Sequence, residues 1–177
     1  YTLAYDDYII HVAPNHWSEH PFYWKNKQEN HLSSVQQEHL SSALGTKPDL
    51  AHILLTHSPV LGVPIEQTGF PDPYHAPCSF FTEQITDLAK AHKSLTCVLG
   101  AHSHINMRVT HDDVDYVTVS SLIETPFEAK LFEVTSERIE MSTVPLASTL
   151  SFEGEYDSEK SFVQGRDVDR SFMRKHG

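Results

Sequence analysis

Residues 51–59, AHILLTHSP, and residues 95–104, LTCVLGAHSH, decide the fold of this chain. Each begins with a short continuous apolar run, the pattern of a strand that is buried on both faces of a sheet. The first run leads to His57, and the second leads to His102 and His104. In open α/β sheets, ligands bind outside the carboxyl ends of the strands. The two stretches therefore predict a histidine-rich site at one edge of an α/β sheet.

Two amphipathic segments indicate helices around these strands. Apolar residues recur at helical spacing in Leu32–Leu44 and in Phe80–His92. Ser33 or Ser34, with a glutamine three residues on, resembles a capping box, and Gly45 is a natural helix end. The expected order is therefore strand, helix, strand, helix, strand.

The remaining patterns are those of short strands and one long loop. Residues 60–78 hold four prolines and are expected to form a loop without regular structure, which in a compact domain is usually functional. Strands are predicted as a pair within residues 1–13 around an Asp6-Asp7 turn, and at about 106–110, 115–120, 128–134 and 138–144, with turns at 111–113 and 136–137. The predicted fold class is an α/β core that ends in antiparallel strands. Residues 1–147 are assigned to this domain and 148–177 to a polar tail or edge segment.

Length and composition narrow the function classes. The chain of 177 residues suits one domain, and its 39% hydrophobic content is that of a globular protein. It begins at Tyr1 without a leader, so we expect it to start inside a longer protein or after processing. No apolar run approaches the length of a membrane span. The formal charge of −11 argues against nucleic acid, although bound metals would still admit a small phosphorylated ligand.

The spacing of His102 and His104 favours metal binding. Residues two apart in an extended segment point to the same side, so both rings can reach one metal, or two metals ~3.5–4 Å apart as in two-metal hydrolases. Gly100 and Ala101 are small enough for a close approach of the backbone. A His-x-His tripeptide is weak evidence in a chain with thirteen histidines. Three unrelated histidines at strand ends, bonded to the backbone, remain the alternative.

Two motifs resemble those of the calcineurin-like metallophosphoesterases. Residues 53–59, ILLTHSP, look like the family's apolar strand ending in His-x-Pro, and residues 100–104, GAHSH, look like its Gly-His-x-His motif. Residues 32–40, LSSVQQEHL, are similar to the helix that commonly precedes the first motif, and the order of elements agrees from about Tyr1 to Val144. The resemblance implies the C-terminal half of a layered α/β/β/α sandwich.

The match departs from the family pattern in three respects. Ala101 stands where the family usually has glycine, and Thr56 replaces a second histidine. The family's early motifs, Asp-x-His, Gly-Asp and Gly-Asn-His, are absent and are expected upstream of Tyr1. The missing N-terminal half of the same domain is therefore an expected partner.

The resemblance also implies a ligand set and a reaction. His57 and His102 would bind one divalent metal ion and His104 a second, the ions being Mn, Fe or Zn. The pair would hydrolyse a small phosphomonoester or phosphodiester. The bridging carboxylates, the phosphate-binding asparagine and the acid histidine have no counterpart here, and the spacing of His16, His20 or Asp112 does not support them as substitutes.

Two other functions remain open at this point. The chain can be a non-catalytic metal-binding or interaction module derived from the fold, or a mononuclear zinc hydrolase that uses three histidines. Residues 60–78 would help to select a substrate, with three aromatic side chains as possible pocket-lining groups or as simple surface residues: Phe70, Tyr74 and His75.

Overall fold

A mixed six-stranded sheet forms the centre of the computed structural model, which describes residues 1–16, 29–146 and 158–176. The strand order is β1-β2-β3-β4-β6-β5. The strands span Thr2–Ala4 (β1), Tyr8–Val12 (β2), Ala51–Leu55 (β3), Leu95–Gly100 (β4), Met107–His111 (β5) and Val114–Thr118 (β6). Strands β2, β3, β4 and β6 run parallel, while β1 and β5 are antiparallel edges. His20 lies outside the described residues.

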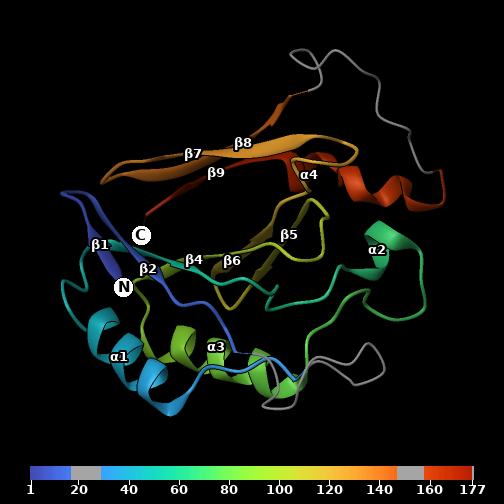
Figure 1. Cartoon of the computed structure of the whole chain (residues 1–177). Helices are drawn as coiled ribbons and strands as arrows, with labels where there is room; N and C mark the ends of the chain where they lie inside the picture. Colours follow the sequence, from blue (N-terminus) through green and yellow to red (C-terminus); the bar gives the residue numbers. More distant parts are fainter. Residues whose placement is uncertain (17–28, 147–157, 177) are drawn as a thin grey trace.

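Two helices cover one face of this sheet (Figure 1). They are α1, Ser34–Leu44, and α3, Ser79–Ala91. The predicted capping box is confirmed, since Ser33 and Gln36 bond each other's backbone N–H, and α1 ends at Gly45. The apolar core between helices and sheet includes Leu54 and Val98, from the centres of β3 and β4.

A three-stranded antiparallel sheet lies on the opposite face (Figure 1). Its order is β7-β8-β9, and the strands span Glu128–Val134, Arg138–Pro145 and Ser171–Lys175. A second core between the two sheets contains Ile53 and Cys97, the alternate residues of β3 and β4. Both faces of these strands are thus buried, which explains their continuous apolar runs. The predicted α/β core ending in antiparallel strands is confirmed.

The loop of residues 60–78 differs from the expectation of no regular structure. It holds a one-turn helix, α2 (Ile65–Thr68), and an antiparallel bridge between Val63 and Tyr74. Gly69 ends the turn with φ +72°, a left-handed conformation that glycine adopts without strain. Residues 60–78 therefore contain regular structure, and the prediction of a loop without it is wrong in this respect.

The C-terminal segment is held by buried charges. It contains the 3-10 helix η2 (Ser158–Gln164) and α4 (Asp167–Arg170), followed by β9. Arg170 forms a two-pronged ion pair with buried Glu128 of β7, at 2.6 and 3.0 Å. Buried Asp169 accepts from the backbone N–H of Arg108 in β5 at 2.7 Å. β9 pairs with β8, while a domain boundary at residue 147 stays a prediction.

None of the helices in the described part of the chain combines the length and the apolar character needed to cross a bilayer.

Candidate metal centre

The carboxyl ends of β2, β3 and β4 are joined by hydrogen bonds. The backbone N–H of Ala101 donates to the carbonyl of His57 at 3.0 Å, which fastens the end of β4 to the end of β3. The buried Asn15 side chain, just beyond β2, exchanges two hydrogen bonds with Ser58, at 2.9 and 3.1 Å. The turn that carries His57 is therefore held from both sides.

Gly100 brings these strand ends close together. A Cβ atom at this position would lie 3.0 Å from the carbonyl oxygen of Ser58 and 3.1 Å from Cα of Pro59. Both neighbours are backbone atoms, which cannot rotate away as a side chain would. The prediction that a small residue here permits close backbone approach is confirmed.

His57 and His102 meet at this edge of the sheet. Nε2 of His57 lies 3.2 Å from Nδ1 of His102, and the ring centroids are 5.1 Å apart in an edge-on arrangement. Burial, reinforced by the neighbouring rings of His57, His75 and His104, lowers the pKa of His102. The neutral imidazole that a metal requires is thereby favoured.

The backbone around the second motif was not foreseen. His102 and His104 both have φ 56°, in the left-handed region, so residues 102–104 form a tight turn and not an extended segment. The expectation that the two rings share a side because of strand alternation is therefore wrong. His104 instead places Nδ1 against Oε1 of Glu124, in the segment between β6 and β7.

The three predicted ligands therefore fall into two contacts. His57 meets His102, and His104 meets Glu124, which was not among the predicted residues. Among the residues that the structure describes, no group of three or more His, Cys, Asp or Glu side chains is arranged to hold a metal ion. The assignment of the three histidines as ligands stays a prediction. Sequence reasoning missed Glu124 because no spacing rule connects it to a histidine twenty residues earlier.

The aromatic residues of the 60–78 loop pack against the C-terminal segment. Phe70 and Tyr74 each contact Phe162 of η2 edge-on, with centroids 5.4 and 5.5 Å apart, and His75 stacks edge-on against Tyr74 at 4.2 Å. Val63, Ile105 and Met107 form the small core beside them. Phe70 and Tyr74 are thus packing residues that hold the loop, and their role in a substrate pocket stays a prediction.

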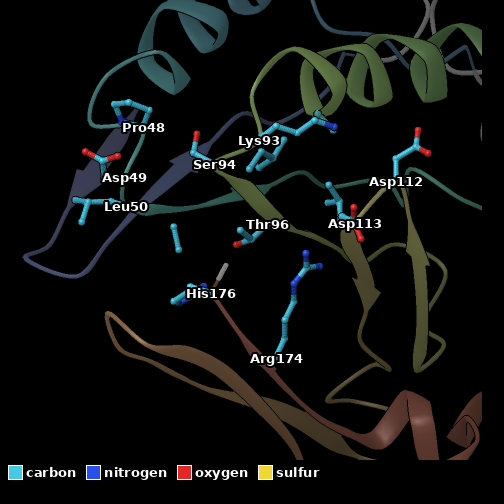
Figure 2. A pocket seen from close by; sticks show the side chains of 14 residues that line it. Pro48, Asp49, Leu50, Lys93, Ser94, Thr96, Asp112, Asp113, Arg174 and His176 are labelled. Carbon is cyan, nitrogen blue, oxygen red and sulfur yellow. The ribbon is translucent and has the colours of Figure 1, made fainter.

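In the described part of the chain, cavities lie at both ends of the central strands. A mostly apolar cavity of about 330 Å³ lies between the sheets, next to the carboxyl ends of β4 and β6. Its lining residues are Leu99, Gly100, Val117, Thr118, Val119, Ser120, Leu122, Ala129, Lys130 and Phe132. The other, of about 460 Å³, lies at the amino ends of β3 and β4 (Figure 2). Figure 2 shows Arg174 pointing into it, with Asp112 and Asp113 to one side. The first cavity therefore lies at the carboxyl ends of β4 and β6, while the second opens at the opposite edge of the sheet.

The fold, but not the sequence, is similar to known proteins. No protein-family model and no curated protein matches this sequence. Among solved structures, the crystal structure of a dimetal phosphatase from Danio rerio matches with a TM-score of 0.52 and 18% identity, over 64% of this chain. The match covers 36% of the phosphatase, so the chain corresponds to about a third of its length. This likeness shows a distant relationship of fold.

Proposed function

We propose that this chain supplies the C-terminal histidine ligands of a dinuclear metal site that hydrolyses phosphate esters. The contact between His57 Nε2 and His102 Nδ1 carries the proposal. Two nitrogens bound to one tetrahedral ion at ~2.0–2.1 Å stand about 3.3 Å apart, which is close to the 3.2 Å in this structure. The separation of the two nitrogens therefore suits one metal ion, which would replace the hydrogen bond between the rings.

The donor set suits borderline divalent ions such as Mn, Fe or Zn. Imidazole nitrogens bind these metals well, and the Glu124 carboxylate against His104 adds negative charge beside them. In the proposed site His57 and His102 hold one ion and His104 holds the second. Two ions bound there would supply hydroxide near neutral pH and stabilise the charge of a phosphoryl displacement. The chain itself orients the ligands through the Asn15–Ser58 and Ala101–His57 hydrogen bonds.

The proposed site also needs groups from outside this chain. Bridging carboxylates and a phosphate-binding asparagine would come from the N-terminal half of the same domain. The limited share of the dimetal phosphatase that is matched supports this view. The apolar cavity between the sheets, with exposed Leu122 and Ile123 beside it, offers a surface on which that half can pack.

Substitution of the histidines tests the proposal. In the complete protein, His57→Ala and His102→Ala should each abolish metal-dependent hydrolysis of an aryl phosphate and leave the circular dichroism spectrum unchanged. His111→Ala, which removes an exposed histidine at the end of β5, is the matched control and should retain full turnover. Undiminished hydrolysis by either site variant refutes the proposal. We also expect this chain alone to be inactive.

Metal counting separates the proposed site from its alternatives. Two equivalents per complete protein support the dinuclear site, whereas one equivalent with retained turnover supports a mononuclear zinc hydrolase. Metal binding without any turnover on monoesters or diesters supports a non-catalytic module.

A further inference from the structure

Glu124 contacts His104 across a loop. His104 follows β4, and Glu124 lies in the segment between β6 and β7, yet Oε1 of the glutamate lies against Nδ1 of the imidazole. Both side chains are about half exposed. Nε2 of His104 makes no hydrogen bond to any of the residues that the structure describes.

The chemistry of this contact fixes the imidazole tautomer. A carboxylate can only accept a hydrogen bond, so Nδ1 of His104 must be the nitrogen that carries the proton. In the neutral ring, Nε2 is then the unprotonated nitrogen and offers its lone pair. Metal-bound histidines commonly donate their other N–H to a carboxylate, which orients the ring and raises its basicity.

The segment that bears Glu124 is anchored on both sides. The carbonyl of Glu124 accepts from the backbone N–H of Phe127 at 2.8 Å, and the carbonyl of Phe127 accepts from Leu146 at 2.8 Å. Upstream, the backbone N–H of Ser120 donates to the buried side chain of Asn106 at 3.1 Å. These hydrogen bonds therefore hold the backbone of Glu124 near His104, within reach of its carboxylate.

We propose that Glu124 is the positioning residue that orients His104 for metal binding through Nε2. The inference rests on the proposed function, because it presumes that His104 is a ligand. An ordinary exposed ion pair would make a different prediction. Such pairs contribute little free energy to the fold, and a pair with only that role would leave metal affinity unchanged when Glu124 is removed.

The tautomer of His104 is the first measurement. We would follow ring nitrogen NMR shifts as the pH is raised and read the tautomer of His104 once these shifts no longer change, when the ring is neutral. The unsubstituted chain should show Nδ1–H, and Glu124→Ala should shift His104 toward Nε2–H. Glu124→Gln keeps an amide oxygen as acceptor and should retain Nδ1–H. Glu133→Ala removes an exposed glutamate of β7 and should change nothing. An unaltered tautomer in Glu124→Ala overturns the inference.

Metal affinity is the second measurement. In a competition titration with Zn²⁺, Glu124→Ala should bind about 10–100-fold more weakly, and Glu124→Gln should recover most of that loss. An equal loss in both variants would mean that the charge ligates the ion directly, which overturns the positioning role. If the unsubstituted chain and its complete protein bind no metal, the proposed function fails, while the tautomer experiment still decides whether Glu124 fixes His104.

Discussion

Two buried histidines should make the stability of this fold sensitive to acid. His11 of β2 and His52 of β3 are both almost inaccessible, and Nε2 of His11 lies 2.9 Å from Nδ1 of His52. Nε2 of His52 donates to the carbonyl of Lys47 at 3.3 Å, since a carbonyl can only accept. Nδ1 of His52 must then accept from His11, and Nδ1 of His11 accepts from the hydroxyl of Thr2 at 3.1 Å. Every ring nitrogen is satisfied when both rings are neutral.

The sign and size of the effect follow from this arrangement. Burial, with a smaller contribution from His52, lowers the pKa of His11 from 6.5 to about 4. The unfolded chain therefore binds a proton as the pH falls through about 6.5, whereas the folded chain does not until about pH 4. The stabilisation is complete above the unfolded pKa and is lost between these values. Between pH about 7.5 and about 4.5 the loss is about 2.5 kcal/mol, at about 1.36 kcal/mol per pH unit.

Urea unfolding at these two pH values, followed by circular dichroism, measures the effect. The matched variant is His11→Gln, whose amide nitrogen can still donate to His52 but cannot titrate. It should lose about 2 kcal/mol less than the unsubstituted chain over the same interval, because other groups titrate equally in both. If the two proteins show the same pH dependence, the neutral histidine pair is not the source of acid sensitivity and the reasoning is refuted.

Two further substitutions test how the fold is held. Arg170→Ala should lower the unfolding free energy by about 3 kcal/mol, because it leaves Glu128 buried without its cation. Arg138→Ala removes an exposed pair with Glu140 and should lower it by less than about 1 kcal/mol. Equal losses in the two variants would contradict the role of burial. Gly100→Ala should destabilise by about 1–3 kcal/mol, because its Cβ would press on the backbone of Ser58 and Pro59. The control is Gly45→Ala, because Gly45 has φ −74° and an added Cβ would make only ordinary contacts. In thermal melting this variant should be as stable as the unsubstituted chain or more stable. A similar loss of stability in both glycine variants would contradict the close approach of Gly100 to Ser58 and Pro59.

Local patterns were sufficient to predict most elements. β3 and β4 are mostly apolar on both faces because each side of the sheet is covered. The helix α1 carries its own start and stop signals in Ser33 and Gly45. These features depend on neighbours along the chain, so the sequence displays them. The contact of His57 with His102 was also accessible, since parallel strands bring their carboxyl ends to one edge.

Two features of the site could not be predicted from sequence patterns. The position of Glu124 is set by how the segment between β6 and β7 crosses the site, and no periodicity reports on that path. The left-handed turn at His102 and His104 lacks the glycine that usually marks one. Within the second motif, sequence reasoning therefore identified the histidines but gave the wrong backbone for them.

Residues 60–78 pack mainly on a small cluster of their own, and His75 is the residue of this segment that acts on His102. His57 and His102 follow strands that are packed between two apolar layers. Residues 60–78 instead pack on a separate cluster around Phe70, Tyr74 and Phe162. Substitutions at Phe70 or Phe162 therefore act first on this cluster and not on the strands that precede the imidazoles. If residues 60–78 select the substrate, as the sequence leads us to expect, that selectivity can change without a change in the strands that carry the proposed metal ligands.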